Sequence, residues 1–143
     1  MDIVFDFDGV LCEYQGWRGH DDIGEPILEM VDLVSDLFDE GHKLKLCTTR
    51  LNPYPKGDLW EDEVVSSGKA KEIIMKWLEE NKILHCFKVI SGYKPFGDVY
   101  IDDRAIRFGD VKGEDIIELE KKVVDVSNDF KCFIHKKQEA NHG

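Results

Sequence analysis

The hydrophobic positions along the chain change their period several times, and each change marks a predicted element. Residues 3–5 form a short apolar run that ends in a polar turn, which predicts a buried strand. Over residues 26–40 the apolar positions follow helical spacing, with Pro26 in the first turn and Gly41 just past the end, which predicts a helix. Residues 44–48 alternate apolar and polar side chains and predict a second strand.

The second half of the chain begins with a long stretch that has no clear period. Residues 51–68 carry Pro and Gly among polar residues, which predicts an unusually long loop. A helix is predicted over residues 69–81, with Ser66 and Ser67 as candidate caps. Two further short strands are predicted at residues 87–90 and 99–101.

Alternating strands and helices predict an α/β fold, here a three-layer α/β/α sandwich around a mainly parallel, doubly wound, Rossmann-like sheet. In the last third, residues 115–124 have helical character, and residues 130–134 are either a strand or a docked tail. The length of 143 residues predicts one domain over 1–143. Its loop inserts, 9–25 and 51–68, are too short to fold alone, so no cap domain is expected.

Composition and charge exclude several classes of function. The formal net charge is -11, from 30 acidic and 19 basic residues, so the chain repels polyanions and non-specific nucleic-acid binding is not expected. No apolar run approaches the roughly 20 residues of a membrane span, and no basic segment precedes the first apolar run, so we expect a cytoplasmic protein without a membrane partner. The four cysteines lie tens of residues apart, which predicts reduced thiols rather than a zinc or redox motif.

Polar residues follow three of the predicted strands. Asp6 and Asp8 follow the first strand, residues 48–50 (Thr-Thr-Arg) end the second, and Asp102 and Asp103 follow the last. Asp is also a common turn residue, which is the plainer interpretation of any one of them. Four carboxylates at one end of a parallel sheet repel each other, which implies either raised pKa values or a bound cation. A hard divalent cation is the natural partner, and Mg²⁺ fits best.

The chemistry-bearing residues come in an order that resembles a known superfamily. Residues 6–11 read Asp-Phe-Asp-Gly-Val-Leu after an apolar strand, Thr48 ends the second strand, Lys94 precedes a proline, and residues 100–103 read Tyr-Ile-Asp-Asp. This series resembles the four motifs of the haloacid dehalogenase (HAD) superfamily of phosphoryl-transfer enzymes. It spans most of the chain and is similar to the small members that lack a cap.

The resemblance implies a magnesium-dependent phosphatase that hydrolyses a phosphate monoester. Asp6 attacks phosphorus and forms an aspartyl-phosphate, and Asp8 handles the proton of the leaving group and of the hydrolytic water. Thr48 and the backbone amides near Phe7 and Thr49 hold phosphoryl oxygens, and Lys94 balances charge.

For the metal, the resemblance implies that Asp103 is a direct ligand beside the Asp6 carboxylate and the Asp8 main-chain oxygen, with Asp102 in support. Thr49 and Arg50 are the candidate substrate-binding residues. For Arg50 the alternative is a solvated charge at a strand end. Trp17 is the single large apolar anchor available to the insert at 9–25.

Two other functions stay open. One is a receiver-like phosphoacceptor, and the other is a catalytically silent relative that binds phosphate or metal. Metal-dependent turnover separates both from the enzyme. The phosphorylated substrate is a small molecule or something larger. Because neither insert encloses a small substrate, we expect either a bulky substrate or cover from a neighbouring subunit of a homo-oligomer.

Overall fold

The computed structural model describes residues 1–52, 67–105 and 121. The chain divides into two compact units, Met1–Asp103 and Arg104–Gly143. All the strands and helices described below belong to the first unit. In the second unit, the single described residue after Ala105 is Lys121, which is helical.

Three predicted segments fall largely outside the described residues. These are most of the loop at 51–68, the helix at 115–124 apart from Lys121, and the strand or tail at 130–134. A single domain over 1–143 stays a prediction.

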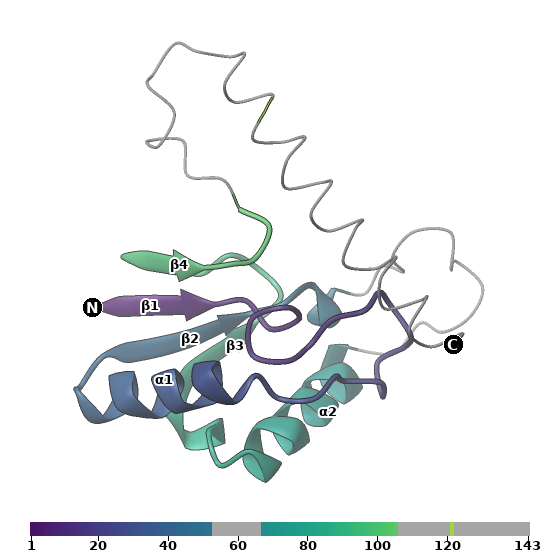
Figure 1. The fold of residues 1–143 in the computed structure, drawn as a ribbon, viewed down its shortest axis with the longest axis horizontal. Coiled ribbons are helices and arrows are strands. Elements are labelled where there is room, and N and C mark those ends of the chain that lie inside the picture. The colour runs from purple at the N-terminus through teal and green to yellow at the C-terminus, as the bar shows by residue number, and fades with distance from the viewer. Residues whose placement is uncertain (53–66, 106–120, 122–143) are drawn as a thin grey trace. The chain divides into compact units, whose positions relative to one another are not determined.

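A four-stranded, all-parallel sheet forms the centre of the first unit (Figure 1). Its strands lie in the order β3-β2-β1-β4. They are β1 (Asp2–Phe5), β2 (Lys43–Cys47), β3 (Phe87–Ser91) and β4 (Val99–Ile101). The chain moves outward from β1 to β2 and β3, and then returns to place β4 on the other side of β1. The strand order therefore reverses at β1, and the α/β class with a parallel sheet is confirmed.

Helix α1 (Leu28–Asp39) connects β1 to β2. Val31 and Val34 are its buried residues, and the backbone after it turns through Gly41 at φ 90°. The N–H of Gly41 donates to the carbonyl of Phe38, and the N–H of His42 donates to that of Leu37, which closes the helix with a Schellman motif. The predicted helix is confirmed, but it begins two residues after Pro26, which lies before the first turn.

Helix α2 (Ser67–Glu80) connects β2 to β3 and buries Ala70, Ile74, Trp77 and Leu78 along one face. It begins earlier than predicted, so Gly68, assigned to the loop from the sequence, lies in its first turn. A glycine in an exposed first turn disturbs few helical contacts, which is why the helix continues through it. Two short 3₁₀ segments flank α2 in sequence, η1 (Thr49–Leu51) and η2 (Leu84–Cys86).

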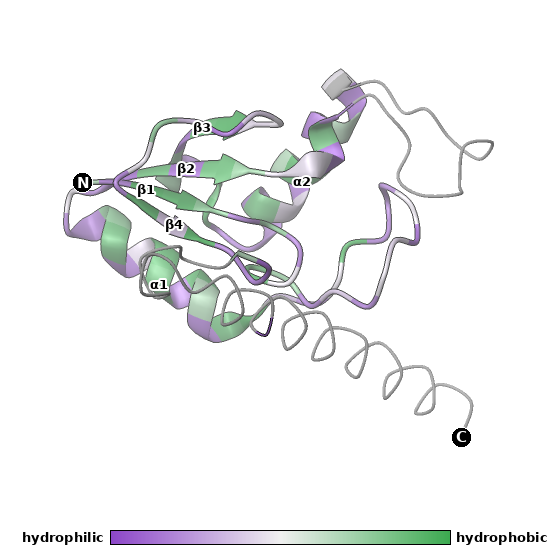
Figure 2. Ribbon diagram, turned by 90° about the horizontal axis from the view of Figure 1, so that it is seen from above, coloured by the Kyte–Doolittle hydropathy of each residue, from purple (hydrophilic) through white to green (hydrophobic). Residues whose placement is uncertain are grey.

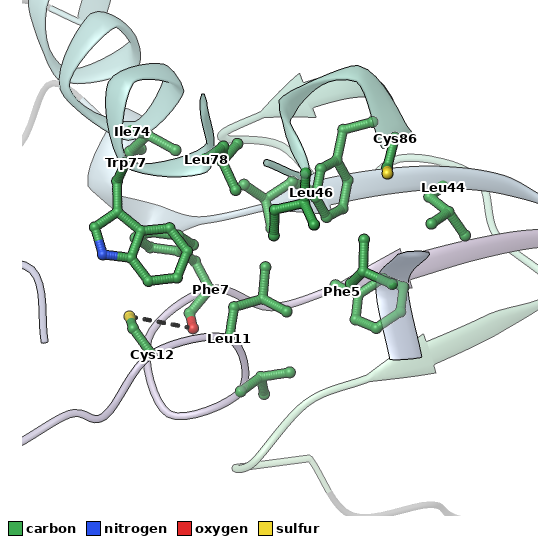
Figure 3. Close-up of a cluster of buried hydrophobic side chains, with 14 of the residues drawn as sticks. Phe5, Phe7, Leu11, Cys12, Leu44, Leu46, Ile74, Trp77, Leu78 and Cys86 are labelled. Atoms are coloured by element: carbon green, nitrogen blue, oxygen red, sulfur yellow. Dashed lines mark hydrogen bonds between the residues drawn. The ribbon is translucent and has the colours of Figure 1, made fainter. Parts of the chain in front are cut away.

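Both helices pack on the same face of the sheet. The core beneath them combines Ile3 and Phe5 of β1 with Leu44 and Leu46 of β2, and it continues into the turn after β1 (Figure 3). Figure 2 shows hydrophobic residues along the strands, and alternating hydrophilic and hydrophobic residues along α1, as expected for a helix with one buried face.

The chain between β3 and β4 crosses the opposite face of the sheet. Alternate strand residues point there, among them Val4 and its neighbour Lys45. The Lys45 ammonium donates to the carbonyl of Phe96 at 2.7 Å and lies 5.5 Å from the centre of its ring. Val4 lies against Gly97, where a Cβ would come within 2.5 Å of it. This crossing brings Lys94 to the carboxyl end of β2.

Among the described residues, neither α1 nor α2 has the length and apolar character that a bilayer-spanning helix requires. The described cysteines, Cys12, Cys47 and Cys86, are free thiols, as predicted.

Candidate functional site

Three carboxylates meet where β1 and β4 end. Asp6 follows β1, and Asp102 and Asp103 follow β4. The two strands pair in parallel with Phe5 opposite Ile101, and the N–H of Asp6 donates to the Ile101 carbonyl at 2.9 Å. One carboxylate oxygen from each Asp lies within 4.8 Å of the other two. The neighbouring strand ends thus bring together side chains that are almost the whole unit apart in sequence.

The surroundings of Asp6 shift its pKa. Burial raises its pKa from the ordinary value of 3.8 to about 7; the hydrogen bond from the Phe7 N–H opposes this, and the charges of Asp102 and Asp103 add to it. A hydrogen bond with Asp103 also contributes. The Phe7 N–H donates to Asp6 Oδ1 at 2.8 Å, which orients the carboxylate. Without a counterion this half-buried acid therefore holds its proton up to neutral pH.

Gly9 lies directly against the cluster. Its φ of 82° is in the left-handed region, and an added Cβ would overlap the carboxylate of Asp103. The same turn is tightened by hydrogen bonds from the N–H groups of Val10 and Leu11 to the carbonyl of Phe7. Glycine at this position lets the turn after β1 approach the end of β4.

The end of β2, at Cys47, lies near the acidic cluster. Burial raises the pKa of the Cys47 thiol, the charges of Asp6 and Asp102 raise it further, and Lys94 lowers it. Cys47 Sγ also donates to the Tyr93 carbonyl at 3.5 Å. The Lys94 ammonium lies 4.6 Å from the centre of the Tyr100 ring and is exposed. Cys47 is thus within electrostatic reach of both the acidic cluster and Lys94.

The carboxylate of Asp8 is outside the acidic cluster and is bound by Arg50. Arg50 Nε donates to Asp8 Oδ2 at 2.7 Å, and Nη2 donates to Oδ1 at 2.8 Å. This is a bidentate pair with both oxygens engaged. The Arg50 side chain is 2% exposed and that of Asp8 13% exposed. The side chains of Asp6 and Asp8, two residues apart, therefore have different partners.

Arg50 uses its other donors on the insert between β1 and α1. Nη1 donates to the carbonyls of Gly19 at 3.4 Å and His20 at 3.1 Å, and Nη2 donates to that of Asp22 at 3.1 Å. With the two bonds to Asp8, all five N–H groups of the guanidinium are engaged. Arg50 is therefore a buried, fully paired residue, not a solvated strand-end charge, and in this arrangement it offers no N–H to a substrate.

The insert itself is closed at its base. The N–H of Glu13 donates to the carbonyl of Glu25 at 2.8 Å, and the N–H of Ile27 donates to that of Leu11 at 2.8 Å. Trp17 lies over the guanidinium, with the Arg50 Cζ 5.0 Å from its ring centre, and Phe7 lies 5.8 Å away. Trp17 thus anchors the insert, as expected from the sequence, but it does so by packing against the charged guanidinium of Arg50.

Thr48 and Thr49 lie at the end of β2. Thr48 is 2% exposed, its N–H donates to the Ser91 carbonyl, and its hydroxyl accepts from the N–H of Arg50 at 3.2 Å. Thr48 therefore caps η1, whereas Thr49, the first residue of η1, is exposed. The capping bond sets the direction in which Arg50 leaves the strand end.

Compared with protein-family models, with curated proteins and with solved structures, the chain has no match. The site is therefore described from its own geometry, in which Asp6, Asp102 and Asp103 lie together and Asp8 pairs with Arg50.

Three features of the site were not predicted from the sequence: the close approach of Gly9 to Asp103, the position of Cys47 near the acidic cluster, and the pairing of Arg50 with Asp8. For Gly9, a glycine directly after an acidic turn was a usable signal. For Cys47 and Arg50 the sequence holds no signal, because their contacts join distant parts of the chain.

Proposed function

We propose that this chain is a magnesium-dependent phosphohydrolase of the HAD type, a capless three-layer sandwich that cleaves a phosphate monoester. The observation that carries the proposal is the meeting of Asp6 with Asp102 and Asp103 at the ends of β1 and β4. In an open parallel sheet, ligands bind at the carboxyl ends of the strands, beside the strand where the order reverses. That strand is β1.

The donor set suits a hard divalent cation. Three carboxylates with oxygens within 4.8 Å of one another, one of them half-buried with a raised pKa, form a site where negative charge is concentrated. Oxygen-only ligands of this kind favour Mg²⁺. Asp6 and Asp103 would hold it with the Asp8 main-chain oxygen, and Asp102 would support them. The ion would polarise the phosphoryl oxygens and reduce their repulsion of the attacking carboxylate.

Asp6 is the nucleophile in this proposal. One carboxylate oxygen forms a bond to phosphorus while the bond from phosphorus to the leaving oxygen breaks, which gives an aspartyl-phosphate and the alcohol. Water then attacks phosphorus, releases inorganic phosphate and restores the carboxylate. The bond from Phe7 N–H to Asp6 Oδ1 holds the carboxylate in one orientation for both steps.

Asp8 transfers the protons. It would donate one to the leaving oxygen and accept one from the hydrolytic water. Both of its oxygens accept from Arg50, which fixes the orientation of the carboxylate. Thr48 and the amides near Phe7 and Thr49 would bind phosphoryl oxygens, and Lys94, whose charge reaches Cys47 beside Asp6, would balance charge.

Turnover of p-nitrophenyl phosphate tests the proposal. We expect hydrolysis with Mg²⁺ and none with a chelator. Asp6→Asn keeps the shape but removes the nucleophile, so activity falls by several orders of magnitude while the circular dichroism spectrum is retained. Asp32→Asn, an exposed position on α1, is the matched control and keeps full activity. Wild-type turnover that is independent of metal, or unchanged in Asp6→Asn, contradicts the mechanism.

The same experiment separates the alternatives. A phosphoacceptor domain becomes labelled with about one phosphoryl group per chain and does not turn over. A silent relative binds magnesium or phosphate without either reaction. Incubation with acetyl phosphate, followed by intact-mass measurement of wild type and Asp6→Asn, distinguishes the two.

A further inference from the structure

Arg50 joins two parts of the chain that are separate in sequence. It lies 42 residues from Asp8 and 28 residues from Asp22, and it donates to both. We propose that Arg50 is a positioning residue that couples the insert loop, residues 13–25, to the Asp8 side chain. The consequence for catalysis rests on the proposed function, whereas the coupling itself is a property of the fold.

The reason for coupling is that the guanidinium has no spare donor and no access to water. Its five N–H groups serve two Asp8 oxygens and three loop carbonyls. The side chain is 2% exposed. If the loop moved away, the guanidinium would lose its three bonds to loop carbonyls, which is unfavourable. The planar group therefore moves with the loop, and its fork cannot then keep the same alignment on Asp8.

Ring contacts strengthen this link. Phe7, next to Asp8 in sequence, and Trp17, in the loop, both lie near the Arg50 guanidinium. Trp17 also contacts the His20 ring edge-on, with centres 4.9 Å apart. The cation is thus held by residues of the turn after β1 and of the loop together. If either the turn or the loop is displaced, its contacts with the guanidinium change, and so does the position of the guanidinium against the other part.

The consequence concerns the orientation of Asp8. In this arrangement each of its oxygens accepts one bond from Arg50, so Arg50 fixes the direction in which the Asp8 carboxylate exchanges a proton with a leaving group. Displacement of the loop by a substrate would shift the guanidinium and change the orientation of Asp8. The position of the loop and the alignment of Asp8 for proton transfer then change together, and a bulky substrate would contact the loop most readily.

Hydrogen exchange of the full chain tests the coupling without any activity. We expect Asp8→Asn to raise the exchange rates of amides in residues 13–25 by about tenfold or more, because one charged bidentate partner is lost. Arg50→Lys does the same, since three ammonium donors cannot serve five acceptors. The amides of α2 stay unchanged in both variants. Arg18→Met, an exposed arginine of the loop bonded to Gln15, is the matched control.

Exchange in residues 13–25 that stays at the wild-type rate in Asp8→Asn overturns the proposal. So does Arg50→Lys with wild-type exchange, because charge alone would then hold the loop. If Arg50→Lys does not fold, the Asp8→Asn result decides by itself.

A kinetic measurement adds the catalytic consequence. With p-nitrophenyl phosphate and Mg²⁺, Arg50→Lys lowers kcat while KM stays within about twofold, as expected when positioning and not binding is lost. A raised KM at unchanged kcat would mean that Arg50 binds substrate, which overturns the proposal. If the wild-type chain shows no turnover, the proposed function fails, and the exchange result still decides whether Arg50 couples loop and Asp8.

Discussion

Asp6 combines two properties that favour opposite protonation states. As a nucleophile or metal ligand it must be ionised, yet burial and two neighbouring carboxylates raise its pKa to about 7. An acid in such surroundings is poised for a cation, which makes ionisation favourable again. The raised pKa therefore belongs to the metal-free chain and gives a test that needs no substrate.

The contribution of Asp6 to the stability of the metal-free chain should fall as pH rises. Between pH 3.8 and about 7 the folded chain keeps the Asp6 proton and the unfolded chain loses it. The folded state then binds more protons, so this contribution is fully present below that range and lost above it. Urea unfolding with chelator at several pH values should show Asp6→Asn becoming more stable than wild type as pH increases. If the free energies of unfolding of Asp6→Asn and wild type differ by the same amount at all pH values, the raised pKa is contradicted.

Gly9 links backbone conformation to the acidic cluster. Gly9→Ala adds a Cβ at φ 82° that overlaps the Asp103 carboxylate, so the carboxylate must move and magnesium affinity should fall. Gly41→Ala is the matched control, because its φ of 90° gives similar strain with no atom within 4 Å of the added Cβ. Calorimetric titration should show weaker Mg²⁺ binding in Gly9→Ala alone. Equal affinity in both variants would show that Asp103 does not depend on this contact.

The helices show how local signals set where an element begins and ends. In α1, Gly41 at positive φ allows the Schellman bonds that end the helix. In α2, Gly68 lies in the helix with open space around it and no positive φ. The two glycines therefore have opposite effects on stability.

Two alanine substitutions test this difference. Gly41→Ala should lower the free energy of unfolding by about 1 kcal/mol, because an L residue is strained at positive φ. Gly68→Ala should raise it by about 0.5 kcal/mol, because alanine has the higher helix propensity. Chemical denaturation of both variants measures the two shifts. The same sign for both would contradict the assignment of one to a cap and the other to a helical turn.

The fold as a whole should respond to the metal, because the three carboxylates lie on two strands that are distant in sequence. Binding to the folded state alone stabilises it, by about 2.7 kcal/mol when magnesium is 100 times above its Kd. The Tm should therefore rise with Mg²⁺ and fall with chelator. A Tm that responds to neither would show that the cluster does not bind the ion.

The same titration separates the two acids after β4. Asp103 contacts Gly9 and hydrogen-bonds Asp6, so we expect Asp103→Asn to lose more of the magnesium-dependent rise in Tm than Asp102→Asn. Asp32→Asn keeps the full rise. A larger loss in Asp102→Asn reverses the assignment of the direct ligand.

Much of the fold was predictable from the sequence because its signals are local. The run at residues 3–5 and the helical spacing before Gly41 each arise from burying one side of a short segment, and such a pattern is written into neighbouring residues. The parallel arrangement followed from the alternation of strands and helices. The position of Asp6, Asp102 and Asp103 at strand ends was also visible, since each follows an apolar strand.

Only the tertiary structure decided which of these side chains meet. Asp6 and Asp8 are equivalent in the sequence pattern. In the structure, however, the two carboxylates after β4 lie beside Asp6, and Arg50 pairs with Asp8. Arg50 follows a strand as a solvated charge would, and its burial depends on loop carbonyls 28 to 31 residues away. Contacts between distant segments leave no period in the sequence, because they arise when the sheet and the insert close around them.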